Sequence, residues 1–506
     1  MVFLQNSPHF WKNLSLSSGI MKNIPFARQI DVSRFFSLLF LLFCAIGQAF
    51  SQGNVLVSEP IALRNDYGYE LIGRLKDRIL LFRDKYDEFE VQAFDNQMRM
   101  SWTRKLEDLE KSGIQILAVA GGRNDFSVIF KVRKRGVTTL RVHKYDPGAN
   151  MIDSMTVKNY GERVFSPPAL DIMLSEDKNC LIAINTAERT QLESTCFMLD
   201  KMQVLWDKTV QLEDNYFESN IKSMTLSNTG DFFLVTETNN RRAKLEAHEF
   251  QILHIYTTAD RITKVPLPDF LTNDVRFSFD NLNRQLVGVG LYADKNRERA
   301  NGIFYANISP EGKAPSLRYE PFTDKVISIL RRKDVEEDTR GISDADIRQV
   351  VLRRDGGALI VAERHHEIQR GTAAGRGFWR DGMRMVMDFY YDDLLLVALH
   401  PTGEMHWTTV LHKKQYSQDD EATFSSYFLF MTPEKLHFMF NDEIKYENTC
   451  SDYVVSPVGE FDRNSLMNTF GQNLRLRFRD ALQLSANECL VPSEFRNKLR
   501  LVLLRF

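Results

Sequence analysis

The chain has 506 residues, of which 43% are hydrophobic and 26% charged, and its formal net charge is −2. This near balance excludes proteins that hold nucleic acid or anionic membranes through bulk positive charge, and we expect neither as a partner. A rule of about 150 residues per domain would give three domains, but single rings of β-strands often exceed that size. The length therefore allows one large all-β domain.

The first 51 residues have the pattern of a signal peptide with an N-terminal extension. Residues 35–46 form a nearly unbroken apolar run that follows basic residues and precedes small ones, which predicts cleavage before Gln52. The run is shorter than the roughly 20 apolar residues that a membrane span needs. One alternative is an uncleaved N-terminal membrane anchor, and a start at Met21 would remove the extension. We expect an exported bacterial protein of the periplasm or cell surface, with no membrane span after cleavage.

Residues 52–506 repeat one unit, which predicts a single domain. Each unit opens with an apolar strand, a polar turn of Ser, Asn, Asp or Gly type and a second apolar strand, and a third strand follows. The eight opening hairpins lie at residues 71–81, 116–129, 172–184, 224–235, 277–289, 350–361, 428–440 and 482–491. Repeats of roughly 40 to 50 residues made of short strands are typical of a β-propeller.

The two ends of the repeat predict how the ring closes. The last unit stops after a third strand at residues 499–506, whereas spare strands at 54–57 and 61–63 precede the first unit. An N-terminal strand that completes the last blade would remove the free sheet edges. We predict eight four-stranded blades, with seven as the alternative because the first unit matches the repeat least well.

Three tryptophans share one place in the unit, in the fourth strand. Trp102, Trp206 and Trp407 each follow a tight-turn residue by six or seven positions, and we expect them to be largely buried between blades. The phrase His400-Pro-Thr-Gly-Glu-Met-His-Trp407 resembles the Thr-Gly-Lys-x-x-Trp phrase of the pyrroloquinoline-quinone-type propeller repeat. This resemblance implies that the tryptophans dock one blade on the next. Its superfamily includes eight-bladed quinoprotein dehydrogenases and the non-enzymatic propeller of the bacterial outer-membrane assembly machinery, so it does not decide activity.

Four cysteines follow residue 51, namely Cys180, Cys196, Cys450 and Cys489. An even number in an exported chain permits two disulfides, with three possible connectivities. All four border predicted strands, where cysteine also serves as a small apolar residue. The sequence leaves both readings open.

Two insertions depart from the repeat. Residues 322–346 join the fifth unit to the sixth and contain a helix-like stretch at 325–333, and residues 363–393 separate the second and third strands of the sixth unit. A blade needs only short turns, so both are extra material. Because strands in a blade alternate in direction, both gaps open on one face, which we call the insertion-bearing face. Function is expected there, because loops on a rigid scaffold commonly carry it.

The second insertion supplies the candidate ligand-binding residues. They are Arg364, His365, His366, Arg376, Phe378, Trp379 and Arg380. Arginine suits carboxylate or phosphate, and the aromatic pair suits a sugar ring or a peptide, whereas the alternative is a loop that packs back on the disc. Adjacent histidines in an extended chain point apart, so we predict no metal here.

No motif of catalysis stands out. The chain has no GxSxG elbow and no GxxxxGK[ST] phosphate loop, so we predict no catalytic residue and no cofactor. The sequence favours an exported, non-enzymatic scaffold that binds a protein or glycan partner through the insertion-bearing face. The alternative is a propeller enzyme, either a quinoprotein-like dehydrogenase or a hydrolase or lyase. A carboxylate cluster at the ring axis would favour the enzyme, and an Arg and aromatic patch would favour binding.

Overall fold

The computed structural model describes residues 55–506 except 111, 164–166, 189–190, 212–219, 296–297, 312–313, 336–339, 373–383 and 445–448. The expected signal peptide, with its alternatives, lies outside the described residues. Within the described part of the chain, no helix is both long enough and apolar enough to cross a bilayer.

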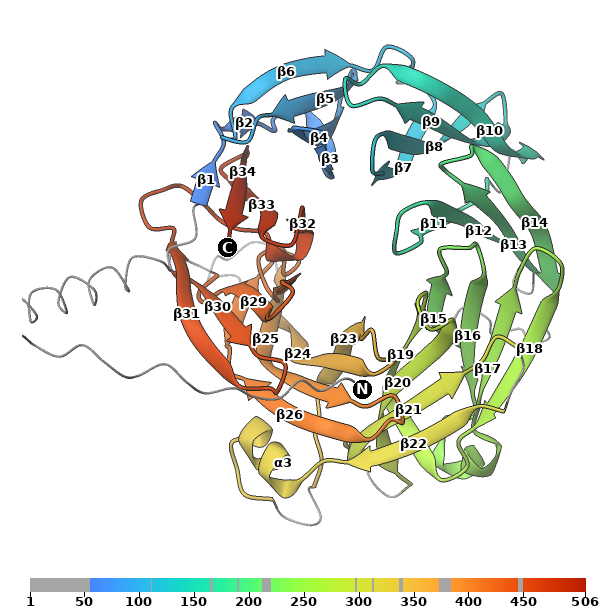
Figure 1. Cartoon of the computed structure of the whole chain (residues 1–506), viewed down its shortest axis with the longest axis vertical. Helices are drawn as coiled ribbons and strands as arrows, with labels where there is room; N and C mark the ends of the chain where they lie inside the picture. Colours follow the sequence, from blue (N-terminus) through green and yellow to red (C-terminus); the bar gives the residue numbers. More distant parts are fainter. Residues whose placement is uncertain are drawn as a thin grey trace, which may run out of the picture. The chain divides into compact units, whose positions relative to one another are not determined.

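Eight antiparallel sheets surround a central opening (Figure 1). In the first four blades the strands run in chain order from the opening to the rim. Blade 1 contains β3 (Asp66–Leu75), β4 (Arg78–Lys85), β5 (Phe89–Phe94) and β6 (Met100–Lys105); blade 2 contains β7 (Ile114–Gly121), β8 (Phe126–Lys134), β9 (Val137–Tyr145) and β10 (Met151–Glu162); blade 3 contains β11 (Leu170–Leu174), β12 (Cys180–Glu188), β13 (Gln191–Met198) and β14 (Gln203–Gln211); blade 4 contains β15 (Ile221–Leu226), β16 (Phe232–Thr238), β17 (Glu249–Ile255) and β18 (Asp260–Pro266).

The remaining blades follow the same order, with additions in blades 6 and 8. Blade 5 contains β19 (Phe270–Asp280), β20 (Gln285–Asp294), β21 (Gly302–Ile308) and β22 (Ser316–Pro321); blade 6 contains β23 (Ala345–Leu352), β24 (Ala358–Thr372), β25 (Arg384–Leu399), β26 (Met405–Leu411) and β27 (Gln415–Gln418); blade 7 contains β28 (Phe428–Met431), β29 (Leu436–Asn441), β30 (Thr449–Val455) and β31 (Phe461–Asn468); blade 8 contains β32 (Leu482–Gln483), β33 (Glu488–Phe495), β34 (Lys498–Arg505) and the N-terminal β1 (Val55–Val57) and β2 (Ile61–Ala62).

The chain is thus an eight-bladed β-propeller, and the alternative of seven blades is wrong. Closure also follows the prediction, because β1 and β2 both pair with β34 and complete the last sheet. In the register, Val57 lies opposite Val502 and Ile61 opposite Leu499. The first and last segments of the described chain therefore share one blade.

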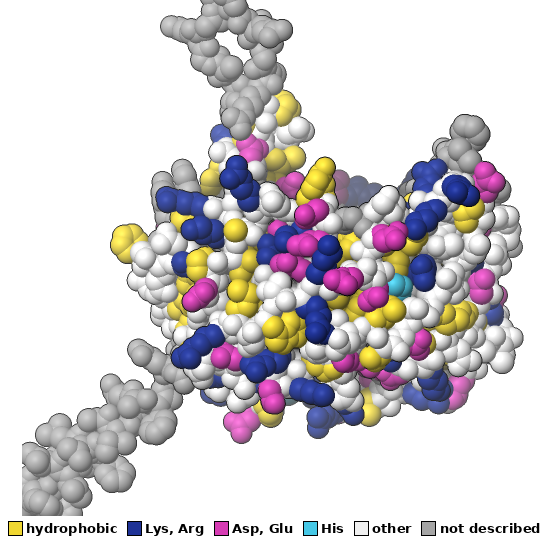
Figure 2. Space-filling view, turned by 90° about the horizontal axis from the view of Figure 1, so that it is seen from above, with side chains coloured by type: hydrophobic (Ala, Val, Ile, Leu, Met, Phe, Trp, Pro, Cys, Tyr) yellow, Lys and Arg dark blue, Asp and Glu magenta, His cyan; other side chains and the backbone are white. Residues whose placement is uncertain are grey.

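The core is divided among the interfaces between neighbouring blades. Middle strands such as β5 are buried at every position, whereas the outer β6 is mostly exposed. One apolar cluster joins Phe82 of blade 1 to Phe126 and Phe130 of blade 2, and another joins Leu81 of blade 1 to Leu501 of blade 8. At the rim, basic and acidic side chains are interspersed with scattered apolar ones (Figure 2), as the balanced composition leads one to expect.

Short turns define the face opposite the insertions, which we call the tight-turn face. There, a side chain near the outer edge of one blade repeatedly donates to a backbone carbonyl in a turn of the next blade. These bonds are Arg104 Nη1 to Gly148 O (2.7 Å), Lys208 Nζ to Tyr256 O (2.6 Å), Arg261 Nη1 to Pro310 O (2.8 Å), Trp407 Nε1 to Pro457 O (3.0 Å) and Arg505 Nη2 to Asn96 O (2.8 Å). With Lys144 Nζ to Asp200 O (3.1 Å) between blades 2 and 3 and Tyr305 Oη to Gly356 O (3.4 Å) between blades 5 and 6, they connect seven of the eight neighbouring pairs of blades.

The three tryptophans occupy equivalent register positions but differ in burial. Trp102, Trp206 and Trp407 lie opposite Ala93, Cys196 and Ala398 of the third strand, each next to a register shift. Trp206 is 5% exposed and donates from Nε1 to Gly230 O of the next blade at 2.9 Å. Trp102 and Trp407 are only half-buried, contrary to expectation, although they occupy the same place on the outer strand as Trp206 does on β14.

The four cysteines downstream of residue 51 are free and buried. Cys180 and Cys196 lie in the apolar cluster between blades 3 and 4, and Cys450 and Cys489 lie in the cluster between blades 7 and 8. They therefore act as small apolar residues in the structure, and it contains neither of the two disulfides that the sequence permitted.

The insertions are more regular than the sequence suggested. The helix-like stretch forms α3 (Asp324–Arg331), which Thr323 caps by accepting from Val326 N, and which buries Ile327 and Leu330 in the core shared by blades 5 and 6. In the second insertion, β24 and β25 continue as a paired hairpin well beyond the blade, and β27 pairs alongside β25. Two shorter 3-10 helices, η1 (Arg242–Ala247) and η3 (Phe478–Asp480), lie on the same face.

Candidate functional site

The two insertions contact each other on the insertion-bearing face. Arg364 of β24 donates from Nη1 to Leu330 O, 2.8 Å away, at the carboxyl end of α3. Arg332, just after the helix, lies with Nη2 3.2 Å from Asp393 Oδ1 of β25. A cation beside the last carbonyls of a helix also suits the helix dipole. The insertions therefore lie side by side, as the strand directions predicted.

A network around Asp388 fixes the projecting part of the hairpin. The Asp388 carboxylate accepts hydrogen bonds from Arg370, from Tyr416 Oη at 2.8 Å and from Gln418 Nε2 at 3.1 Å. These partners come from β24 and β27, the strands on either side of β25. The hydrogen bond from Arg370 lowers the pKa of Asp388, so the carboxylate stays charged at neutral pH.

At the base of the hairpin, an ion pair is completely buried. Glu363 Oε1 lies 2.6 Å from Lys413 Nζ, and both side chains are 0% exposed. Arg348 Nε donates to Glu363 at 3.2 Å, and Ser426 Oγ donates at 2.7 Å. Burial lowers the pKa of Lys413, although Glu363 opposes this shift. Because buried charges are costly unless fully partnered, this network fixes the geometry of the surrounding side chains.

A pocket of about 450 Å³, which we call the inner pocket, lies beside this network. It is lined by Arg348, Gln349, His365, Glu367, Tyr391, Ser426, Tyr427, Phe428, Leu429, Arg479 and Ala481. Three blades contribute, since these residues come from blade 6, the start of blade 7 and the segment before β32. Arg479 lies over the Tyr391 ring with 4.6 Å between the guanidinium carbon and the ring centroid. The pocket thus combines guanidinium groups with aromatic and apolar walls.

Two donors in the wall of the inner pocket lack an acceptor in the described part of the chain. They are Nη2 of Arg348 and the hydroxyl of Tyr427, whose residue is 8% exposed. Burial raises the pKa of Tyr427, so its hydroxyl keeps its proton. Buried donors without partners are rare in folded proteins, and each calls for an explanation.

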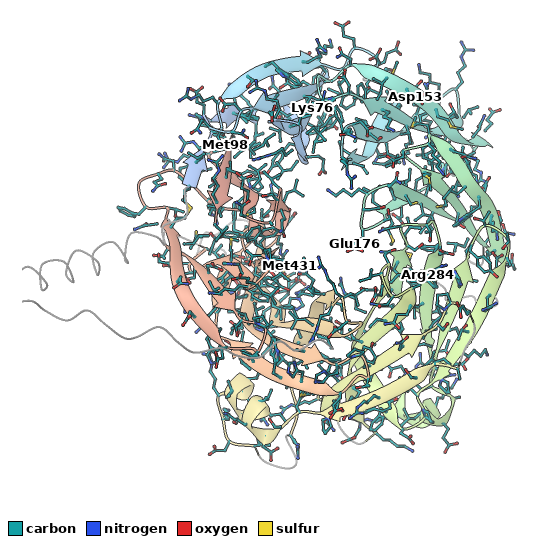
Figure 3. The ribbon with its side chains drawn as sticks, in the orientation of Figure 1. Lys76, Met98, Asp153, Glu176, Arg284 and Met431 are labelled. Atoms are coloured by element: carbon teal, nitrogen blue, oxygen red, sulfur yellow. The ribbon has the colours of Figure 1, made fainter. Side chains whose placement is uncertain are left out.

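A second cavity, of about 670 Å³, lies along the central opening, and we call it the channel cavity. Within it, Tyr69 donates to Glu494 Oε1 at 2.7 Å, and Arg477 also binds that carboxylate. Partial desolvation raises the pKa of Glu70, which is exposed to the cavity, and lowers that of Lys178, and the two residues line the same cavity from blades 1 and 3. Figure 3 places Glu176 and Met431 beside the central opening as well.

The two cavities adjoin each other. Ala481 lines both, and the segment around η3 separates them, with Arg479 in the inner pocket and Asp480 in the channel cavity. The opening therefore presents a carboxylate-rich side next to an arginine-rich side.

The residues predicted from the sequence are spread over different positions. His365 lines the inner pocket, Arg364 braces α3, and His366 stacks on Tyr390 with 4.5 Å between ring centroids. Arg376, Phe378, Trp379 and Arg380 lie outside the described residues. Among the described residues, no three His, Cys, Asp or Glu side chains are grouped to hold a metal ion.

Sequence reasoning missed the residues that make up most of the inner pocket. Arg348, Tyr427 and Arg479 are far apart in the chain, and only ring closure brings them together. One signal was present, since Glu363 directly follows the apolar run of β24 and a charge at the end of a buried strand needs a partner.

No family model and no curated protein sequence matches this chain. Solved structures do resemble it. Saccharomyces cerevisiae Sqt1 has a TM-score of 0.42 at 11% identity, covering 90% of this chain and 99% of that one. Porphyromonas gingivalis dipeptidyl peptidase 4 has a TM-score of 0.42 at 10% identity, covering 86% of this chain and 56% of the peptidase. A europium-containing methanol dehydrogenase has a TM-score of 0.38 at 9% identity, covering 89% and 93%. Likenesses this distant carry no argument about function.

Proposed function

We propose that this chain is an exported, non-enzymatic propeller scaffold that binds a protein or glycan partner through its insertion-bearing face. The observation that carries the proposal is the bracing of both insertions by a buried ionic network beside the inner pocket. The ring closes without the two insertions, and the charged groups of their ionic network are costly to bury. A role in binding a partner would explain why the chain has these two insertions.

The rigidity of this surface also favours binding. Binding costs less conformational entropy when the surface is ordered beforehand. The hairpin is held on β25 by Asp388 and at its base by the pair of Glu363 and Lys413. The inner pocket supplies arginines and aromatic rings, which are residue types enriched where partners are held most strongly.

Capture from an extract of the cells that make the protein tests this proposal with two matched variants. Met385 of β25 is 52% exposed on the projecting hairpin, and Met100 of β6 is 51% exposed on the rim. With the full chain, Met385→Lys should lose the captured partner and Met100→Lys should retain it. Equal recovery with both variants would refute binding through the insertion-bearing face.

The channel cavity supports a second candidate, an enzyme of hydrolase or lyase type. Glu70, with its raised pKa, and Lys178, with its lowered pKa, face one cavity, as an acid and a base would need to do. Glu70→Gln would then abolish turnover and leave partner capture unchanged. If Glu70→Gln leaves every activity of the full chain unchanged, the enzyme candidate fails.

A further inference from the structure

We propose that the inner pocket binds the carboxylate of an acidic peptide segment, with an apolar residue next to the acidic one. This inference rests on the proposed function, since it names the chemistry that a protein partner would present to the insertion-bearing face. The geometry that carries it is an exposed arginine, Arg479, stacked on Tyr391 at a pocket that Arg348, His365 and Tyr427 also line, beside an apolar wall.

Arg479 is the most available cation of the pocket. It is exposed, it stacks on Tyr391, and no carboxylate lies within ion-pair distance of it in the described part of the chain. Stacking on an aromatic ring orients the guanidinium plane and leaves its N–H donors free for a second partner. A carboxylate suits these donors because it can accept two parallel hydrogen bonds from one guanidinium.

Arg348 and Tyr427 supply further donors on the blade 6 and blade 7 sides. Arg348 is oriented through its Nε by Glu363. Its Nη2 makes no hydrogen bond and lies 3.9 Å from Asp346 Oδ2, and the Tyr427 hydroxyl has no acceptor in the described part of the chain. An unpartnered buried donor carries the full cost of its lost hydration. Both atoms are enclosed by the wall of the pocket, so a ligand oxygen would reach them only after a side chain of the wall shifts, and the contact would then remove part of that cost.

The charged side chains around the pocket favour the binding of an anion. Its lining has two arginines and His365 against one carboxylate, Glu367, which lies exposed on the hairpin. Two more carboxylates are close but already engaged, since Glu363 pairs with Lys413 and Arg348, and Asp346 lies 2.7 Å from His365 Nδ1 and 3.9 Å from Arg348 Nη2. Arg479 is therefore the cation of the lining that has no carboxylate partner among the described residues, and the excess positive charge of the lining rests on it.

The same imbalance favours a peptide over an acidic sugar. Sugar hydroxyls need acceptors as well as donors, and Glu367 is the one carboxylate of the lining. Phe428, Leu429 and Ala481 form an apolar part of the wall, which suits an aliphatic side chain beside the carboxylate. A volume of about 450 Å³ accommodates a short segment of this kind.

Calorimetric titration of the full chain tests the inference with a defined pair of probes. The probes are acetyl-Leu-Glu-Leu-amide and its neutral isostere acetyl-Leu-Gln-Leu-amide. We expect the Glu peptide to bind at least about tenfold more tightly, which is the effect of one hydrogen bond between charged groups. Arg479→Gln and Tyr427→Phe should each weaken binding of the Glu peptide. Arg479→Gln should change the thermal unfolding midpoint little, because it loses only an exposed stacking contact on Tyr391, and Tyr427→Phe should not lower the midpoint, because the hydroxyl has no acceptor in the described part of the chain.

The control is Arg284→Gln, at an exposed arginine in the turn between β19 and β20 on the tight-turn face (Figure 3), and it should bind like the parent chain. Equal affinity for the two peptides, no binding of the Glu peptide, or unchanged binding by Arg479→Gln would overturn the inference. Sodium glucuronate that binds more tightly than the Glu peptide would overturn the choice of a peptide. If Met385→Lys abolishes capture while Arg479→Gln and Tyr427→Phe do not, the proposed function stands and the pocket assignment fails.

Discussion

The two faces of the ring are held together by different kinds of interaction. On the tight-turn face, side chains of one blade donate to backbone carbonyls in a turn of the next, as Lys208 does to Tyr256 and Arg261 does to Pro310. On the insertion-bearing face, charged side chains bind one another, as Glu363 and Lys413 do. The first arrangement repeats around the ring, and the second includes a completely buried pair next to the inner pocket.

This difference between the faces predicts which substitutions affect the whole ring and which act locally. A backbone carbonyl is present whatever residue occupies the turn, so bonds of the first kind tolerate sequence divergence among blades. A buried ion pair needs both partners, so the second kind depends on particular residues. Substitutions on the tight-turn face should therefore affect the whole ring, whereas those on the insertion-bearing face should act locally and on binding.

The largest effect is expected at the interface between blades 3 and 4. Trp206→Ala removes a buried indole and its bond to Gly230, and should lower the free energy of unfolding by about 3 to 5 kcal/mol. Trp407→Ala should cost less, because Trp407 is half-buried. Chemical denaturation measures both, and an unchanged midpoint for Trp206→Ala would rule out its role in docking the blades.

The buried ion pair should come next. Lys413→Met leaves Glu363 with Arg348 and Ser426 alone, and should cost about 3 kcal/mol. Adding Glu363→Gln to Lys413→Met should recover part of the loss, since no uncompensated charge then remains. If the double variant is less stable than the single one, the cost arises from packing and not from charge.

Two glycines, Gly230 on the tight-turn face and Gly161 at the end of β10 on the insertion-bearing face, separate backbone strain from steric fit. Gly230 and Gly161 both have positive φ, at +89° and +72°, but a Cβ on Gly230 would lie 2.6 Å from Leu205 Cδ1, whereas one on Gly161 would meet nothing within 4 Å. We expect a loss of about 1 kcal/mol for Gly161→Ala and about 2 kcal/mol for Gly230→Ala. Equal losses would show that the approach of blade 3 to this turn is not tight.

The smallest effect is a local pH dependence of the hairpin. The pKa of Asp388 is lower in the folded chain than in the unfolded one, so its contribution is complete above the unfolded value of about 4. It is lost as the pH falls through the lower folded pKa. Hydrogen exchange of residues 384–391 should therefore quicken on acidification below about pH 4 relative to β5, and Asp388→Asn should remove this pH dependence. Parallel changes in both segments would contradict a local role.

The repeat made most of the fold predictable from sequence. Local signals sufficed for the hairpins and for α3, because each depends on neighbouring residues. The closure by β1, which pairs Val55 with Leu504, was predicted from the last strand that the repeat lacks. The extension of β24 and β25 was read as a loop, since residues 363–372 continue the strand with charged and polar side chains that look solvated. These charged and polar residues do not end the strand, because Asp388 and β27, which lie outside residues 363–372, supply hydrogen-bond partners to the hairpin.

The candidate site was less predictable. His365 was found because it lies within an insertion, whereas Arg348, Tyr427 and Arg479 lie in or next to ordinary strands of three different blades. No spacing along the chain connects them, since their proximity is a property of the closed ring. Trp407 shows a related limit, because its position in the repeat was clear and its partial exposure depended on the neighbouring blade.

The most direct test places a photo-crosslinking amino acid at one position on each face. Position 367 lies on the hairpin at the inner pocket, and position 284 lies in a turn on the tight-turn face. After irradiation in cell extract, the full chain should form a discrete crosslinked product from position 367 and none from position 284. A product from position 284 alone, or the same product from both positions, would contradict binding through the insertion-bearing face.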